Sequence, residues 1–587
     1  DAKGSMRFKK EDLKGTDKNF WLSDKIPHAF NYYNGGKITV EKADDGSDYF
    51  DPHGMHIAGI LAGNDTEKDI KNFNGIDGIA PNAQIFSYKM YSDAGSGFAG
   101  DETMFHAIED SIKHNVDVVS VSSGFTGTGL VGEKYWEAIR ALRKAGIPMV
   151  VATGNFATSA SSSSWDLVAN NNLKMTDTGN VTRTAAHEDA IAVASAKNQT
   201  VEFDKVKIGG ESFKYRNIGA FFDKNKIITN EDGSKAPSKL KFVYIGKGQD
   251  QDLIGLDLKG KIAVMDRIYT KDLKDAFKRA TDKGARAIMV VNTVNYYNRD
   301  NWTELPAMGY EADEGTKSQV FSISGDDGVK LWNMINPDKK TEVKRNNKED
   351  FKNNLEQYYP IDMASYNSNK PNVGDEKEID FKFAADTDKE LYKEDIIVPA
   401  GSTSWGPRTD LLLKPDVSAP GKNIKSTLNV INGKSTYGYM SGTSMATPIV
   451  AASTVLIRPK LKEMLERPVL KNLKGDDKID LTSLTKIALQ NTARPMMDAT
   501  SWKEKSQYFA SPRQQGAGLI NVANALRNEV VATFKNTDSK GLVNSYGSIS
   551  LKEIKGDKKY FTIKLHNTSN RPLTFKVSAS AVTTDAL

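Results

Sequence analysis

The chain has 587 residues, of which 39% are hydrophobic and 26% are charged. At about 100–200 residues per domain, this length allows three to five domains with buried cores. The 80 basic residues nearly balance the 75 acidic ones, and the two kinds are interleaved, which argues against a nucleic-acid-binding tract. No apolar run approaches the ~18 residues of a membrane helix. The absence of cysteine excludes a disulfide scaffold, a cysteine nucleophile and thiolate metal sites.

The first part of the chain, residues 1–200, predicts alternating strands and helices. Short apolar runs over 116–122, 147–152 and 190–195 indicate buried strands. Between the first two, residues 132–144 place apolar side chains at helical spacing. This rhythm is typical of right-handed crossovers and a parallel sheet.

The middle of the chain differs in character. Residues 201–345 predict a small domain of their own, with strands over 261–265 and 287–291 and a helix over 272–284 between them. Residues 346–390 are too polar to assign and are interpreted as a connecting segment.

Residues 391–531 again show the alternating strand and helix patterns of residues 1–200. The patterns predict strands over 396–400 and 415–421, and helices over 444–457, 481–491 and 519–527.

The last 56 residues change to a period of two. Residues 560–565 and 573–577 alternate apolar and polar side chains, which predicts the opening of a β-sandwich over 532–587.

The segment Gly442-Thr-Ser-Met-Ala-Thr-Pro448 has the features of a nucleophile at a helix start. Gly442 permits a tight turn, and Ser444 would open a helix whose free N–H groups and positive dipole end favour developing negative charge. We expect Pro448 in the first turn of that helix, where a proline is tolerated. Alone, Ser444 is better interpreted as an ordinary helix-capping serine, because a nucleophile needs a base.

A base is offered by Pro52-His-Gly-Met-His-Ile-Ala-Gly-Ile60, which holds two of the seven histidines. His53 stands where a helix would begin. A metal pair with His56 is disfavoured, because the i, i+3 spacing lacks the intervening Glu of a zinc-protease helix. We interpret His56 as a structural neighbour of His53.

A third motif is Val151-Ala-Thr-Gly-Asn155, a strand end followed by Gly-Asn. Such a segment can present the Asn155 amide beside the carboxyl edge of a sheet, where it would stabilise an oxyanion. By itself, Gly-Asn would be a turn.

Together and in this order, the three motifs resemble those of the subtilisin family of serine proteases. The resemblance covers about 20–200 and 390–530, and it implies an α/β fold: a subtilisin-like parallel sheet with helices on both faces. It also implies the roles of seven residues: the nucleophile Ser444, the general base His53, the oxyanion donor Asn155, and the substrate-binding residues Ser122, Ser123, Gly124 and Gly154.

The nucleophile and the base are 391 residues apart, too far for one compact domain of ordinary size. We therefore expect 201–345, followed by the connecting segment 346–390, to be inserted between two parts of a catalytic domain, 1–200 and 391–531. The insert resembles the protease-associated domain of streptococcal and lactococcal cell-envelope proteases. Residues 532–587 are expected to begin a fibronectin III-like β-sandwich.

A Ser–His pair needs a carboxylate to hold the imidazole. In the family this Asp ends the first core strand, well before the His. The candidates upstream of His53 either follow no apolar strand or lie too close to it: Asp12, Asp17, Asp24, Asp44, Asp45 and Asp51. We expect a separate N-terminal fragment of the same precursor, released by self-cleavage, to supply the Asp, so that this chain alone is inactive. An artificially shortened chain, or Asp44 or Asp45 as the triad member, are the alternatives.

Within the family, the resemblance is strongest to streptococcal cell-envelope proteases that cleave chemokines. It implies a secreted or cell-wall-associated bacterial endopeptidase that acts on host proteins, CXC chemokines among them, as a virulence factor. The alternatives are a caseinolytic or complement-cleaving protease of the same family, or a non-catalytic surface binding protein on a protease scaffold. An α/β-hydrolase esterase is disfavoured, because no Gly-x-Ser-x-Gly elbow surrounds Ser444. Structural calcium is common in the family, but the sequence shows no ligand set for it.

Overall fold

The computed structural model describes residues 7–579 except for several internal segments. These are 40–50, 72–74, 94–99, 125–131, 158–178, 219–221, 231, 269, 294–317, 340–369, 386–387, 394–396, 431–434, 499–508, 538–540, 542 and 555. Asp44 and Asp45 therefore lie outside the described residues.

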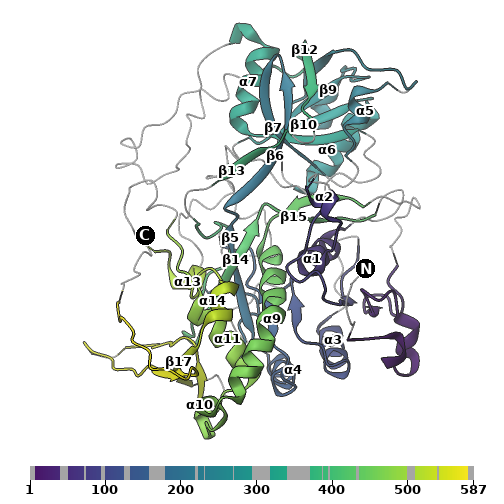
Figure 1. Ribbon diagram of the computed structural model, residues 1–587. Coiled ribbons are helices and arrows are strands. Elements are labelled where there is room, and N and C mark those ends of the chain that lie inside the picture. The colour runs from purple at the N-terminus through teal and green to yellow at the C-terminus, as the bar shows by residue number, and fades with distance from the viewer. Residues whose placement is uncertain are drawn as a thin grey trace.

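A four-stranded parallel sheet organises the lower half of the molecule in Figure 1. Its strands stand in the order β14 (Val417–Lys422), β5 (Ile191–Lys197), β4 (Met149–Ala152) and β3 (Val119–Val121). All neighbouring pairs are parallel. The strands predicted over 116–122, 147–152, 190–195 and 415–421 are present, although the first begins at Val119 rather than at residue 116. The strand predicted over 396–400 is wrong: its described residues, 397–400, form no strand, and Pro399 makes an isolated bridge to Ala196.

Helices cover both faces of this sheet. One face packs against α9 (Thr443–Glu466), α11 (Leu481–Thr492) and α14 (Val522–Arg527), and the other against α3 (Asp101–Lys113) and α4 (Glu133–Lys144). Adjacent strand residues serve opposite faces: Val150 joins the α9 side and Val151 the α4 side. The expected α/β fold with helices on both faces is confirmed.

A second, two-stranded parallel sheet stands apart from the first. It consists of β1 (His28–Asn31) and β2 (Phe86–Lys89). Among the described residues, β2 pairs only with β1, and β3 pairs only with β4. Each of these two sheets therefore has an edge strand whose backbone groups are open to another strand.

The remaining elements of this half are short. They are η1 (Lys10–Asp12), η2 (Gly15–Phe20), α1 (His53–Ala62), α2 (Glu67–Lys71), the hairpin β15 (Ile424–Thr427) and β16 (Tyr437–Met440), α10 (Pro468–Lys471), η6 (Gly475–Asp477) and α13 (Pro512–Gln515).

The middle of the chain forms an eight-stranded mixed sheet, at the top of Figure 1. Its order is β12 (Glu376–Phe383), β8 (Lys239–Tyr244), β9 (Ile262–Asp266), β10 (Ala287–Val291), β11 (Gln319–Ile323), β7 (Glu211–Asn217), β6 (Thr200–Ile208) and β13 (Glu390–Lys393). Its helices are α5 (Asn225–Ile228), η3 (Asp250–Leu253), α6 (Thr270–Asp282), α7 (Gly325–Ile335) and η4 (Pro337–Lys339).

The segment expected only to connect, 346–390, contains a strand of this sheet. Strand β12 pairs with β8 and β6, and its apolar residues Ile379, Phe381 and Phe383 enter the core. These three residues alternate with charged ones, which is the signature of a strand with one buried face. The high charge of the segment hid this pattern.

The C-terminal region forms a three-stranded antiparallel sheet, β18 (Val543–Tyr546), β17 (Val530–Thr537) and β19 (Lys564–Asn567). The predicted strand over 573–577 is wrong, because that segment has no regular structure. The strand expected over 560–565 is also displaced, since β19 begins at Lys564. Tyr560 and Val577 are 87% and 89% exposed, and an alternating pattern forms a strand only where another layer covers its apolar face.

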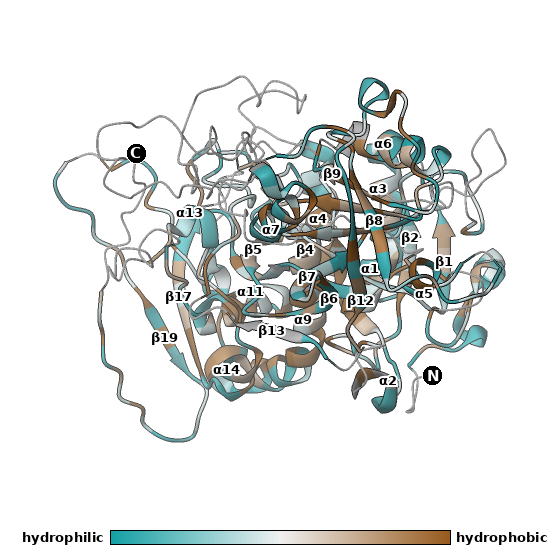
Figure 2. Cartoon of the chain, turned by 90° about the horizontal axis from the view of Figure 1, so that it is seen from above, coloured by the Kyte–Doolittle hydropathy of each residue, from teal (hydrophilic) through white to brown (hydrophobic). Residues whose placement is uncertain are grey.

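The described residues contain no helix with the length and apolar character needed to cross a bilayer. Figure 2 shows apolar residues gathered on the strands in the interior of the molecule, with hydrophilic segments around them.

Candidate active site

Ser444 lies where the carboxyl ends of β3 and β4 meet the beginning of α9. It is the second residue of that helix. Ser122, directly after β3, faces it: Ser444 Oγ donates to Ser122 O over 3.1 Å, and Ser122 Oγ donates to Ser444 O over 2.8 Å. The nucleophile candidate and one substrate-binding candidate are therefore in direct contact.

The carbonyl of Ser444 is available to Ser122 because of Pro448. In a regular α-helix, this carbonyl would accept a hydrogen bond from the backbone N–H of the residue four positions later. That residue is Pro448, and proline has no backbone N–H. We expected Pro448 in the first turn, but it is the sixth residue of α9. The helix accommodates it because Ser122 Oγ satisfies the carbonyl that the proline leaves open.

The side-chain amide of Asn155 is held by Thr443, the first residue of α9. Asn155 Oδ1 accepts from the backbone N–H of Thr443 over 2.9 Å and from its hydroxyl over 3.2 Å. The same hydroxyl accepts from Gly154 N over 3.2 Å. With its oxygen occupied in this way, the amide presents its N–H₂ group as donor. Thr443 belongs to the Gly442–Pro448 motif, but the motif alone predicts no role for it.

Two glycines allow this close approach. A Cβ on Gly154, which has φ +104°, would meet the Phe156 ring at 2.7 Å. A Cβ on Gly442 would lie 3.0 Å from Asn155 Nδ2. Both positions require a residue without a side chain if the amide and the helix start are to meet.

His53 is the first residue of α1, which packs against α9 and β15. Its backbone N–H donates to Asp51 Oδ1 over 2.9 Å. Burial lowers the pKa of the His53 imidazole, and the nearby Asp51 charge opposes this. Among the described residues, no hydrogen bond joins His53 to Ser444, and no carboxylate bonds its imidazole. The described residues thus contain no Ser–His hydrogen bond, and burial favours the neutral imidazole, the form that a general base needs.

His56 has a purely local role. It is fully buried, and its Nε2 lies 3.0 Å from Ile424 O and 3.2 Å from Gly438 O. Burial lowers its pKa to about 4. His56 therefore links α1 to the β15–β16 hairpin, as a structural neighbour of His53 would.

Ser123 and Gly124 line a small hollow that continues from Ser122. A Cβ on Gly124 would lie 2.6 Å from Thr182 Cβ. Charged groups close the hollow: Asp101 accepts from Tyr135 Oη over 2.7 Å and from Arg183 Nη1 over 3.2 Å. The complete lining is Tyr91, Asp101, Met104, Ser123, Gly124, Tyr135, Arg183 and Thr184.

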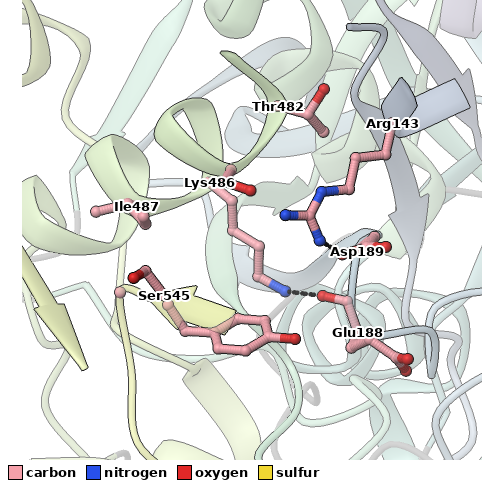
Figure 3. A pocket seen from close by; sticks show the side chains of 10 residues that line it. Arg143, Glu188, Asp189, Thr482, Lys486, Ile487 and Ser545 are labelled. Carbon is pink, nitrogen blue, oxygen red and sulfur yellow. Dashed lines mark hydrogen bonds and ion pairs between the residues drawn. The ribbon is translucent and has the colours of Figure 1, made fainter. Parts of the chain in front are cut away.

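A further hollow, shown in Figure 3, is lined by Arg143, Glu188, Asp189 and Lys486. Arg143 Nη1 is 2.6 Å from Asp189 Oδ1, and Lys486 Nζ donates to Glu188 O over 2.7 Å. Lys486 also pairs with the buried Asp416 over 2.8 Å. These contacts tie α4 and α11 to the central sheet, so the arrangement is that of a structural ion-pair network.

Comparison with known proteins gives matches along nearly the whole chain. The subtilase (peptidase S8) family model matches residues 14–518. The PIII-type proteinase of Lactococcus lactis subsp. cremoris is 29% identical over 581 residues, covering 96% of this chain and 25% of that protein. The C5a peptidase of Streptococcus pyogenes is 25% identical over 577 residues, covering 96% and 41%.

Among solved structures, the patellamide maturation protease is 13% identical with a TM-score of 0.34, covering 84% of this chain and 89% of that one. The chain spans about a quarter of the length of the lactococcal proteinases that it matches.

Proposed function

The chain belongs to the subtilase family, and from that premise we propose that it is the main catalytic part of a secreted or cell-wall-associated bacterial serine endopeptidase. Ser444 is the nucleophile, His53 the general base and Asn155 the oxyanion donor. The observation that carries this proposal is the placement of Ser444 at the start of α9, against Ser122 and beside the amide that Thr443 orients.

The proposed reaction follows from these positions. His53 accepts the hydroxyl proton as Ser444 Oγ attacks the scissile carbonyl, and it then protonates the leaving amine. Asn155 Nδ2 and the free N–H groups at the start of α9 stabilise the negative oxygen of the tetrahedral intermediate. Water, activated by the same imidazole, releases the acyl group. The segment Ser122–Gly124 binds the substrate backbone as an added strand.

We also propose that the triad carboxylate comes from an N-terminal fragment of the same precursor, separated by self-cleavage. Two observations support this. One edge of β2 and one edge of β3 have no partner among the described strands, so an added strand can bind at either edge. The His53 imidazole bonds no described carboxylate, and burial lowers its pKa although the nearby Asp51 charge opposes this.

The proposed substrates are host proteins, CXC chemokines in particular. The polar hollow beside Ser123 favours a substrate residue that can bond to Asp101 or Arg183. A relative named as a C5a peptidase makes a complement fragment one competing substrate. Casein is the other, as the resemblance to lactococcal cell-envelope proteases implies. A non-catalytic surface binding protein is the second class of function.

Reconstitution tests these proposals. The chain would be incubated with CXC chemokines, C5a and casein, with and without a peptide that carries the precursor's N-terminal Asp strand, and the products read by mass spectrometry. We expect cleavage only when both pieces are present, and none with Ser444→Ala.

Three outcomes would contradict the proposals. Full activity of the chain alone would make Asp44 or Asp45 the triad carboxylate. Failure of a fluorophosphonate to label Ser444 in the assembled protein would favour the binding protein. Cleavage of C5a or casein but of no chemokine would contradict the proposed chemokine substrates and favour the protein that is cleaved.

A further inference from the structure

Two neighbouring segments near the start of the described chain and the end of α3 bring two imidazoles and a carboxylate together. Asp17 belongs to η2, His28 begins β1, and His114 directly follows α3. One potential ligand atom from each lies within 4.8 Å of the other two. His114 Nε2 and Asp17 Oδ2 are 3.3 Å apart. Two atoms bound about 2 Å from a tetrahedral zinc ion are separated by about 3.3 Å, so this pair already has the spacing.

His28 is the least explained member of this cluster. It is 1% exposed, and its Nδ1 has no hydrogen-bond partner among the described residues. Its ring centroid lies 4.6 Å from that of His114 and 5.7 Å from that of Phe20. A buried polar atom without a partner costs free energy. A cation bound at His28 Nδ1 would remove that cost.

The imidazole of His114 has the hydrogen-bond partner that a metal-binding histidine usually has on its second ring nitrogen. Its Nδ1 lies 3.3 Å from Tyr88 Oη, so the second ring nitrogen has a partner that fixes the ring orientation. Nδ1–H then donates to Tyr88, and Nε2 offers its lone pair towards Asp17. To bind a metal in this way, the His114 imidazole needs only to change its tautomer. The ring does not lose a proton overall.

In this structure the ammonium group of Lys113 pairs with Asp17, the carboxylate that a metal ion would bind. Its Nζ is 2.6 Å from Asp17 Oδ2, and its side chain is 52% exposed. The lysine can therefore swing into solvent when a more highly charged ion competes for the same carboxylate.

We propose that Asp17, His28 and His114 bind a divalent transition-metal ion of the zinc class, with solvent as fourth ligand. Two imidazoles and one carboxylate suit zinc, whereas calcium prefers oxygen ligands throughout. The site ties η2 to β1 and to the end of α3, and so fixes the residues that precede β1 on the body of the protein. It is independent of the assignment of the active site.

The test is zinc binding to the full 587-residue chain after dialysis against EDTA. Titration with zinc sulfate against a chromophoric chelator gives the stoichiometry and the affinity, and thermal unfolding gives an independent readout. We expect one tight equivalent and a higher unfolding midpoint with zinc. His114→Ala and the near-isosteric Asp17→Asn should each weaken binding about 100-fold, since each removes one of three ligands.

Two further variants guard against misinterpretation. His106→Ala removes an exposed histidine of the same helix α3, 66% exposed at its side chain, and should bind zinc as the unmodified chain does. Lys113→Met removes the competing cation and should tighten binding several-fold. A folded chain that binds no zinc, or one whose affinity is unchanged in both His114→Ala and Asp17→Asn, would overturn the proposal.

Discussion

The chemistry proposed for Asn155 depends on which end of its amide is free. An asparagine side chain can point either its oxygen or its nitrogen at a substrate, and the hydrogen bonds that it makes decide which of the two it is. Thr443 supplies two donors to Oδ1, one from its backbone and one from its hydroxyl. We infer that Thr443 is a positioning residue: it leaves Nδ2 as the group that meets the developing negative charge.

Substitution of these two residues should affect turnover rather than substrate binding. On the assembled enzyme, Asn155→Ala should lower kcat about 100- to 1000-fold with little change in KM, a magnitude known from subtilisin. Thr443→Val should lower kcat by a smaller factor, because the backbone N–H still holds the amide, and Thr443→Ser should restore it. Steady-state kinetics give both constants, and an Asn155→Ala enzyme within threefold of the unmodified rate would contradict the role.

Helix α9 lacks one of its backbone hydrogen bonds, and a side chain from outside the helix replaces it. Pro448 deprives Ser444 O of its normal helical partner, and Ser122 Oγ replaces it from the end of β3. The proline thereby ties the nucleophile's own backbone to the strand that is proposed to bind substrate. The helix and the strand are held in register by one side-chain hydrogen bond.

A double-mutant cycle isolates this bond. Ser122→Ala should lower the free energy of unfolding by about 1–3 kcal/mol, because it leaves the part-buried carbonyl of Ser444 without a partner. In a Pro448→Ala background the new N–H of residue 448 can bond Ser444 O, so the same substitution should cost under about 1 kcal/mol. Denaturant unfolding measures all four proteins.

Ser453→Ala provides the control for that cycle. Its hydroxyl bonds Ile449 O within the same helix over 2.7 Å, so its cost should be the same with Pro448 or Ala at that position. Equal costs of Ser122→Ala in both backgrounds would show that the proline does not free the carbonyl.

Across the molecule, buried histidines couple stability to acid. His56 and His187 are both fully buried, and burial lowers the pKa of each to about 4. Each is neutral in the folded state. The unfolded chain, with histidine pKa near 6.5, binds more protons between pH 6.5 and 4, so stability falls as the pH falls through this range.

We therefore expect the free energy of unfolding to drop by about 2 kcal/mol per histidine between pH 7 and pH 5. His56→Gln should make the dependence shallower, since glutamine does not titrate. His106→Gln, at an exposed histidine on α3, should leave it unchanged. Denaturant unfolding at several pH values measures this, and a stability that does not change from pH 7 to pH 5 would contradict the neutral buried histidines.

Elements with strong local patterns were predicted well. The helix over 132–144 and the strands over 147–152 and 190–195 are present because their apolar side chains repeat at the correct period and lead to one core. The strand over 573–577 was wrong, since its pattern is equally regular but nothing described covers its apolar face. Strand β12 was missed because its charged residues outnumber its three buried ones.

The sequence by itself determined the family, the α/β class and the identity of the candidate site residues, because local motifs and periodicity are properties of short segments. Only the tertiary structure decided that Ser122 bonds the nucleophile's backbone, that Thr443 orients Asn155, and that Asp17, His28 and His114 meet. These contacts join residues that are 322 positions apart for Ser122 and Ser444, 288 for Asn155 and Thr443, and 97 for Asp17 and His114. Such distances carry no local signal, since only the packing of whole elements brings their side chains within hydrogen-bonding reach.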